Sequence, residues 1–201
     1  MPTAARRAAA GSAAECEPGA APSLAALGER VVIIGPSCSG KSTLGERLSE
    51  RIGAPFVELD ALYWKPGWQE TRDDEFQERI RDATSGARWV VAGNYRRHIR
   101  NSVWPRAETI VWLDFPMGLV LRRIITRSWR RSRRRELLWG TNYERFWRQL
   151  KLWNERDSLI AYTWRNYPDQ ARDFAAAMYD PALSHVRFVR FRSPKEAQAL
   201  A

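Results

Sequence analysis

Residues 35–42 combine the residue types and the spacing that bind a polyphosphate. They read Gly-Pro-Ser-Cys-Ser-Gly-Lys-Ser, a complete Gly-x-x-x-x-Gly-Lys-Ser phosphate loop. The glycines leave the backbone bare, so successive N–H groups can surround phosphate oxygens, while the lysine reaches the β- and γ-phosphates and the following hydroxyl holds Mg²⁺. We expect this loop to bind ATP through Gly35, Ser37, Ser39, Gly40, Lys41, Ser42 and Thr43. Lys41 is also an expected catalytic residue, and Ser42 an expected metal ligand.

A pair of carboxylates, Glu58 and Asp60, stands at the end of the next short apolar run. If that run is a strand, residues two positions apart lie on the same face, and both carboxylates point toward the phosphate loop. We expect Glu58 to hold Mg²⁺ through water and Asp60 to take the proton of a substrate hydroxyl. The alternative is a strand end that is merely solvated.

Arginines crowd the segment 116–135, which contains no acidic residue. On a helix, a spacing of i, i+4, i+7 and i+11 places four of them on one face: Arg123, Arg127, Arg130 and Arg134. Arginines stabilise the charge that spreads over a phosphoryl group during transfer. We therefore expect Arg127, Arg130 and Arg134 to be catalytic, on a mobile flap at about 128–141 that closes over the triphosphate. A solvated basic helix and contacts with nucleic-acid phosphates are the alternatives.

Three further residues are candidates for binding the acceptor of a phosphoryl group. Arg96 follows Gly-Asn-Tyr after an apolar run and could hold an anionic group; the alternative is a surface arginine. Trp64 and Trp68 lie just beyond Asp60 and could stack on a ring, or could simply pack their own loop. Trp89 and Trp112 are expected in the core, and Trp147, Trp153 and Trp164 are expected to pack the C-terminal helices.

Alternating elements predict how these residues are positioned. Apolar runs indicate strands at 31–35, 55–59, 89–92, 109–113 and 186–191. Helices are expected at 41–52, 71–84, 116–131, 142–166 and 169–178, the second with a capping box at Thr71, and a short last helix begins at Ser193 with a capping box and a proline. Strands joined by helical crossovers predict a parallel sheet covered on both faces, with ligands at the carboxyl ends of its strands.

Composition is compatible with one enzyme domain. The chain has 201 residues, of which 44% are hydrophobic, and a net charge of +10 that favours polyanionic ligands. Residues 1–28 are rich in Ala, Gly, Pro and Ser and are expected to be a disordered leader before a domain at 29–201. The two cysteines suggest no disulfide framework, and neither a membrane span nor a secretory signal is apparent. We expect a cytoplasmic protein; the oligomeric state is left open.

Several of these segments resemble known families. The phosphate loop and the arginine-rich flap resemble the adenylate-kinase-like P-loop kinases, which include shikimate and gluconate kinases. Residues 59–68 (Leu-Asp-Ala-Leu-Tyr-Trp, then Pro-Gly-Trp), 93–95 (Gly-Asn-Tyr) and 130–144 (arginine-rich, then Trp-Gly-Thr-Asn-Tyr-Glu) more closely resemble bacterial proteins labelled "DNA topology modulation protein". This resemblance covers roughly residues 29–201.

The resemblance implies a three-layer P-loop kinase fold with sheet order 2-3-1-4-5 and an arginine-rich lid. It also implies ATP binding and, as the leading function, phosphoryl transfer to a small acceptor such as a nucleotide or nucleoside. An ATP-binding regulator associated with nucleic acid is the alternative. One departure from the family pattern is Ala92, where many nucleotide kinases carry an aspartate that helps to hold Mg²⁺. Either that role passes to Glu58 or Asp60, as the Asp-x-Asp of shikimate-kinase-like members would suggest, or it is weakened and turnover is slower.

Overall fold

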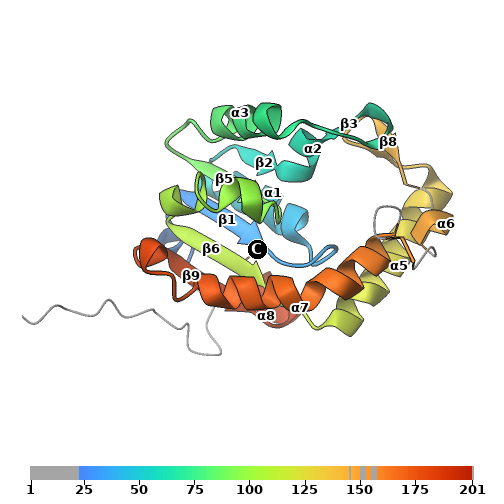
Figure 1. Cartoon of the computed structure of the whole chain (residues 1–201). Coiled ribbons are helices and arrows are strands. Elements are labelled where there is room, and N and C mark those ends of the chain that lie inside the picture. The colour runs from blue at the N-terminus through green and yellow to red at the C-terminus, as the bar shows by residue number, and fades with distance from the viewer. Residues whose placement is uncertain (1–22, 145, 150–152, 155–157, 201) are drawn as a thin grey trace, which may run out of the picture.

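A five-stranded parallel sheet forms the centre of the protein (Figure 1). The computed structural model describes residues 23–144, 146–149, 153–154 and 158–200. The strands are ordered β2 (Phe56–Glu58), β5 (Trp89–Ala92), β1 (Arg30–Ile34), β6 (Thr109–Leu113) and β9 (Arg187–Phe191). Counted among themselves along the chain, they follow the expected order 2-3-1-4-5; their labels differ because two short hairpins outside the sheet are numbered too.

Helices cover both faces of this sheet, so the three-layer α/β architecture is confirmed. One face carries α3 (Asp73–Ala83), α4 (Arg96–Ile99) and α7 (Leu159–Ala177). The other carries α1 (Lys41–Ile52), α5 (Met117–Arg134) and α8 (Pro194–Gln198). β6 is buried along its whole length between these layers, which explains its uninterrupted apolar sequence. Trp89 and Trp112 lie in the core, as expected.

The chain between α5 and α7 differs from the expected long helix at 142–166. α5 continues to Arg134, and a hairpin follows, made of β7 (Leu137–Leu138) and β8 (Asn142–Tyr143). A short α6 (Phe146–Gln149) comes next, and α7 begins only at Leu159, where the Ser158 side chain accepts a hydrogen bond from the backbone of Ala161. α7 then continues through Pro168, so the expected break before 169 is absent. Local propensity was overridden here by capping and by tertiary contacts.

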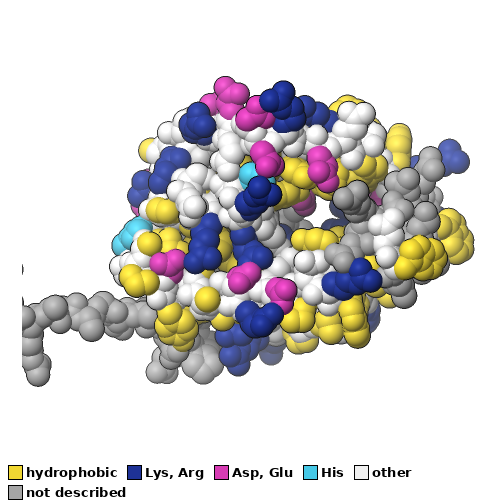
Figure 2. Space-filling view, viewed as in Figure 1, with side chains coloured by type: hydrophobic (Ala, Val, Ile, Leu, Met, Phe, Trp, Pro, Cys, Tyr) yellow, Lys and Arg dark blue, Asp and Glu magenta, His cyan; other side chains and the backbone are white. Residues whose placement is uncertain are grey.

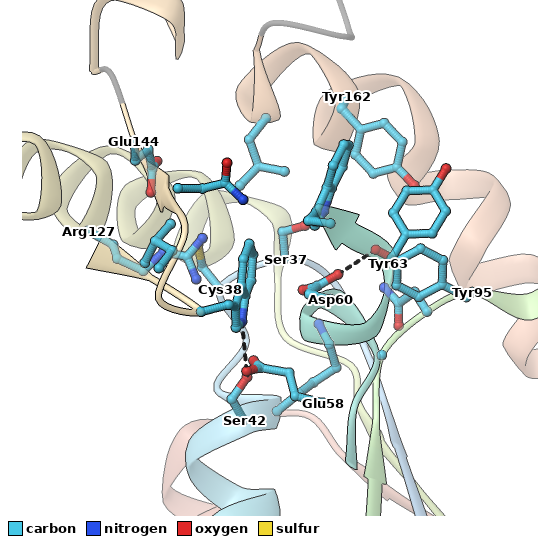
Figure 3. Close-up of a pocket in the computed structure, with 18 of the residues that line it drawn as sticks. Ser37, Cys38, Ser42, Glu58, Asp60, Tyr63, Tyr95, Arg127, Glu144 and Tyr162 are labelled. Carbon is cyan, nitrogen blue, oxygen red and sulfur yellow. Dashed lines mark hydrogen bonds between the residues drawn. The ribbon is translucent and has the colours of Figure 1, made fainter. Parts of the chain in front are cut away.

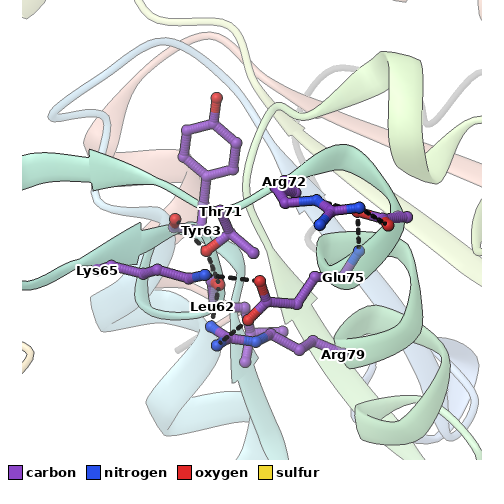
Figure 4. Close-up of polar contacts among 8 residues, drawn as sticks. Leu62, Tyr63, Lys65, Thr71, Arg72, Glu75 and Arg79 are labelled. Atoms are coloured by element: carbon purple, nitrogen blue, oxygen red, sulfur yellow. Dashed lines mark hydrogen bonds and ion pairs between the residues drawn. The ribbon is translucent and has the colours of Figure 1, made fainter.

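A second small hairpin follows β2. Leu59–Tyr63 form a short helix, α2, and β3 (Trp64–Lys65) and β4 (Gln69–Glu70) flank a 3-10 turn, η2 (Pro66–Trp68). α3 begins at Asp73 rather than at 71, because the hydroxyl of Thr71 donates to the carbonyls of Leu62 and Tyr63 instead of capping the helix (Figure 4). Thr71 therefore closes the base of this hairpin. The capping box at Ser193 is present as expected, and α8 starts there.

The expected leader divides at residue 23. Residues 1–22 lie outside the described part of the chain, whereas Leu24–Ala26 form a 3-10 helix, η1, and Leu27 is completely buried beside the sheet. The carbonyl of Leu27 accepts a hydrogen bond from Thr109 in β6. The folded region thus includes these last residues of the segment expected to be disordered. Two further 3-10 helices are η3 (Trp104–Arg106) and η4 (Pro181–Leu183). Within the described residues, no helix is both long and apolar enough to cross a membrane.

Candidate functional site

A large hollow lies beyond the carboxyl ends of β1, β2 and β5, where the parallel sheet predicts a ligand site. The phosphate loop, α2 and the hairpin after it, the start of α4, α5, the β7–β8 hairpin and α7 all contribute to its lining. The opening is visible in the space-filling view, with both acidic and basic side chains around it (Figure 2). Residues distant in the sequence therefore meet in one place.

The phosphate loop has the shape of an anion cradle. Gly40 has φ +101° and precedes the first residue of α1, so the helix N-terminus opens into the hollow. The ammonium group of Lys41 donates to the carbonyl oxygens of Gly35 and Pro36, at 2.9 Å each. Burial lowers the pKa of Lys41, while nearby Asp60 raises it. The lysine is thus held over the loop, where a phosphate can replace backbone carbonyls as its partner.

Two side chains that the sequence analysis did not select fix this loop from outside. Asn94 accepts a hydrogen bond from the N–H of Gly35 at 3.1 Å and donates to the Gly35 carbonyl at 2.5 Å. Arg123, on α5, donates to the carbonyl of Ser39 at 3.0 Å. The Gly-Asn-Tyr run after β5 was the available signal for Asn94, but only the fold reveals that it reaches the first strand.

Glu58 accepts hydrogen bonds at both of its oxygens. Ser42 donates to Oε1 at 2.5 Å, and the indole of Trp139 on the β7–β8 hairpin donates to Oε2 at 2.9 Å (Figure 3). A serine hydroxyl and a carboxylate are hard oxygen ligands of the kind that Mg²⁺ prefers, with water and substrate phosphates completing its shell. These residues therefore fit the metal. Among the described residues, no cluster of three or more His, Cys, Asp or Glu could hold a metal by itself.

Asp60 lies on α2 rather than on the strand, so the expected strand-face argument for its pairing with Glu58 was wrong. Both carboxylates nevertheless line the hollow, because the helix starts at Leu59 and turns Asp60 toward it (Figure 3). Tyr95 donates its phenolic proton to Oδ1 of Asp60 at 2.8 Å. Burial raises the pKa of Asp60, and the hydrogen bond from Tyr95 and the charge of Lys41 oppose that rise. Tyr95 is a further residue that the sequence analysis missed.

The arginines that line the hollow match the expected set only in part. Arg123, Arg127 and Arg131 are partly buried on the inner side of α5, in register with buried Ile124 and Ser128. Arg130 reaches the rim, whereas exposed Arg134 lies outside the hollow. The inner row follows i, i+4 and i+8, because that row continues the apolar stripe that packs α5 on the sheet.

Arg127 has the strongest position in this row. It forms no ion pair with any described residue, and its Nε is buried without a hydrogen-bond partner. It lines the same hollow as Lys41 and Asp60, the catalytic candidates. Arg131 differs, because it lies 3.2 Å from Glu136 and 3.7 Å from Glu144. Of the three arginines in this inner row, Arg127 is thus the most available to an incoming anion.

Arg96 lines the hollow but already has a partner. It forms an ion pair with Asp173 of α7, and its guanidinium lies over the ring of Phe174, 5.8 Å from the centroid. Its expected role of holding an acceptor's anionic group would require this pair to break. The simplest role of Arg96 is to join α4 to α7 at the edge of the hollow.

Aromatic rings form a continuous wall on one side of the hollow. The rings of Trp64 and Trp68 meet edge to face at 5.5 Å, and those of Trp68 and Trp139 at 5.9 Å. Buried Asn142 joins the two hairpins that carry them, since it accepts from the N–H of Trp68 at 2.8 Å and donates to the carbonyl of Lys65 at 3.1 Å. The sequence predicted Trp64 and Trp68 here, but not Trp139.

Three other tryptophans do not pack the C-terminal helices as expected. Trp147, Trp153 and Trp164 are exposed by 73%, 77% and 59%. The longest of the C-terminal helices, α7, buries residues such as Ala161 and Phe174 instead. Aromatic content alone did not distinguish a packing role from a surface one.

The chain is similar in sequence to named kinases. No family model matches the chain. It is 31% identical over 133 residues to a shikimate kinase of Rhodopseudomonas palustris, covering 58% of this chain and 65% of that protein. It is 33% identical over 110 residues to a shikimate kinase of Nitratidesulfovibrio vulgaris, covering 47% and 62%. The chain thus spans less than two thirds of each of these relatives. A gluconokinase structure from Sinorhizobium meliloti has a TM-score of 0.46 at 20% identity, covering 87% of this chain and 92% of that one.

The two sequence relatives are both kinases by name. Together with the phosphate loop and the sheet order, they point to the P-loop kinase superfamily.

Proposed function

We propose that this protein is an ATP-dependent kinase that transfers the γ-phosphoryl group of ATP to a hydroxyl of a small acceptor. One observation supports the proposal above all. The phosphate loop, the Ser42–Glu58 pair and the partly buried carboxylate of Asp60 line a single hollow at the carboxyl edge of the sheet. Such a hollow can hold a triphosphate and an acceptor side by side. The similarity to named shikimate kinases is consistent with this chemistry.

The loop end of the hollow would bind the triphosphate. Backbone N–H groups at the start of α1 would surround the phosphate oxygens, and Lys41 would leave its carbonyl partners for the β- and γ-phosphates. Ser42 and Glu58 would hold Mg²⁺, directly or through water. The metal, when bound, neutralises charge on the phosphates.

Asp60 would serve as the general base. It would accept the proton of the acceptor hydroxyl while the hydroxyl oxygen bonds to the γ-phosphorus and the bond from that phosphorus to the bridging oxygen breaks, releasing ADP. Tyr95 would hold the carboxylate in position through its 2.8 Å hydrogen bond. Arg127 would stabilise the charge on the transferring group, because it faces the hollow without an ion-pair partner among the described residues.

We also propose that the segment around 128–141 acts as a lid. It leads from the end of α5 into the β7–β8 hairpin, and it places Trp139 on Glu58 across the hollow. ATP would be expected to protect the amide hydrogens of this segment from exchange, because the triphosphate compensates the arginines there.

A screen for ADP release tests the kinase proposal. Purified protein would be incubated with Mg-ATP and a panel of nucleosides, nucleotides and hydroxylated acids. Lys41→Ala should abolish the activity found, whereas Lys195→Ala, an exposed lysine of α8 outside the hollow, should leave it unchanged. A folded Lys41→Ala variant that binds and uses ATP normally would refute the proposal.

Association with nucleic acid is a second candidate, favoured by one surface. Exposed Trp129 and Trp147 both meet the ring of Phe146 edge to face, with centroids 5.2 and 5.7 Å apart, and exposed Arg130, Arg133 and Arg134 lie beside Trp129. Rings for stacking next to basic groups suit single-stranded nucleic acid, and the resemblance to proteins labelled for DNA topology modulation is consistent with this. Binding that weakens steeply with salt and is lost in Trp129→Ala would support it. Salt-independent binding would argue against it.

A further inference from the structure

We infer that the acceptor is an uncharged ring compound with a hydroxyl group, rather than a phosphorylated or carboxylated one. The inference rests on the proposed kinase function and names its substrate class. It concerns the end of the hollow beyond Asp60, which α2, the β3–β4 hairpin, the start of α4 and α7 enclose. Charge and ring contacts at this end each support it.

Each basic side chain described at this end already faces a carboxylate. Arg96 forms its ion pair with Asp173, while Arg97 and His98 lie 3.9 and 3.1 Å from Asp73. The neighbouring Lys65 lies 2.6 Å from Glu75 (Figure 4). An acceptor phosphate or carboxylate that bound Arg96 would have to break its pair with Asp173 and leave that carboxylate unpaired, which is costly because this pair is partly buried.

Negative charge at this end adds to this discrimination. Asp60 must be ionised to act as a base, and Glu70 also lines the hollow. Either group repels a second anion nearby and costs an uncharged acceptor nothing. The loop end has the opposite character, because Lys41 and Arg127 have no carboxylate paired with them among the described residues. The hollow therefore has two ends of different charge. The loop end attracts anions, and the other, the neutral end, favours uncharged ligands.

A ladder of rings supplies the binding surface of the neutral end. Tyr63 contacts Tyr95 at 4.8 Å and Trp64 at 5.0 Å, and the ladder continues from Trp64 to Trp68 and Trp139. Tyr95 also touches Asp60, so the ladder begins at the proposed base. A flat ring stacked on this surface gains contact without any charge of its own.

Polar groups of α7 that line the hollow suit hydroxyls rather than anions. Gln170 of α7 donates to the hydroxyl of Tyr162 at 3.3 Å and accepts from Asn94 at 3.4 Å. Amides and phenols can both donate and accept, so they can exchange partners with sugar-like hydroxyls. Asp60 then selects the hydroxyl that lies nearest the loop end.

Direct binding measurements test this inference. The protein would first be saturated with Mg²⁺ and a non-hydrolysable ATP analogue, so that no probe can occupy the nucleotide site. Cytidine, guanosine and thymidine would then be titrated by calorimetry, alongside their 5′-monophosphates, shikimate and gluconate. We expect at least one nucleoside to bind about tenfold or more tightly than its monophosphate and than both acids.

Two variants sharpen the result. Trp68→Leu should weaken nucleoside binding roughly tenfold, whereas Trp164→Leu, an exposed tryptophan outside the hollow, should not change it. Asp173→Asn frees Arg96 and should tighten monophosphate binding roughly tenfold. Trp64→Leu is the substitute if Trp68→Leu does not fold.

Each outcome decides between distinct ideas. If the monophosphates or acids bind more tightly than the nucleosides, the neutral acceptor is overturned and the kinase proposal stands. The same holds if the ATP analogue binds but none of the probes does. Nucleoside binding that Trp68→Leu and Trp64→Leu leave intact overturns the ring ladder as its site. Absence of analogue binding refutes the kinase proposal itself, and the inference with it.

Discussion

The two ends of the hollow are built in different ways. The loop end consists of residues close in sequence, held between β1 and α1 and faced by one continuous helix, α5. The acceptor end is assembled from two hairpins about seventy residues apart, β3–β4 and β7–β8, which Asn142 joins. A common phosphate donor needs only the first kind of construction, since its chemistry does not vary. The second kind can change its rings and charges without disturbing the sheet.

Asp60→Asn should have the largest effect at the boundary between the two ends. The amide keeps the shape of the carboxylate but cannot accept the acceptor's proton, so phosphoryl transfer should fall by roughly 10²–10⁴. ATP affinity by calorimetry should stay close to that of the parent protein, because the loop end is intact. Unchanged transfer would remove Asp60 from the mechanism, and lost ATP binding would mean that the two ends are not separable.

Arg127→Ala should reduce transfer by about 10²-fold, since it removes a cation from the charge developing at the γ-phosphate. Arg134→Ala is the matched control, an arginine of the same helix outside the hollow, and it should leave the rate unchanged. Single-turnover rates at saturating ATP provide the measurement. Equal losses in both variants would favour a general electrostatic effect over the inner row of α5.

The pH dependence of transfer should report on Asp60. Burial raises the pKa of this carboxyl, so the base becomes protonated, and the rate falls, at a higher pH than an exposed aspartate would produce. Below that pKa the rate should drop about tenfold per pH unit. The stability effect has the opposite sign: folding is favoured below the ordinary aspartate pKa, and this contribution is lost as pH rises through the raised one. Asp60→Asn should remove both dependences; a profile unchanged in that variant would assign the titration elsewhere.

Asn142→Ala should have the smallest effect. It leaves the N–H of Trp68 and the carbonyl of Lys65 without their partner, at a cost of about 1–3 kcal/mol to the contact between the hairpins. Amide exchange should accelerate in both hairpins, and acceptor KM should rise by about tenfold or less, with ATP affinity unchanged. Faster exchange in the phosphate loop as well would contradict the division into two ends.

The sequence was most informative where structure is local. The strand before the phosphate loop and α1 after it followed from an apolar run and from the phosphate-loop motif, whereas the sheet order followed from the family resemblance. Lys41, Ser42 and Asp60 were found in this way, although Asp60 lies on a helix that the pattern did not suggest.

Contacts between distant segments were predicted less well, because their residues meet only through tertiary structure. Trp139 reaches Glu58, and Asn94 reaches Gly35, across large separations in sequence that no local period encodes. The catalytic arginines were chosen by helical spacing alone. The sequence allows two rows, one that continues from Arg127 to Arg130 and one that continues to Arg131. The apolar contacts of Ile124 decided between them, and these depend on how α5 lies on the sheet.

The hydrogen bond from Trp139 to Glu58 has a thermodynamic consequence. Both oxygens of Glu58 are engaged, one by the β7–β8 hairpin and one by Ser42. A ligand that binds Oε2 of Glu58 therefore competes with Trp139 of the β7–β8 hairpin. The coupling between ligand binding and hairpin docking is reciprocal. Loosening the hairpin must then strengthen that ligand's binding by the same factor by which the ligand loosens the hairpin. Trp139→Phe retains a ring but lacks the donor. In this variant, ligand binding at Glu58 and docking of the β7–β8 hairpin would become independent of each other.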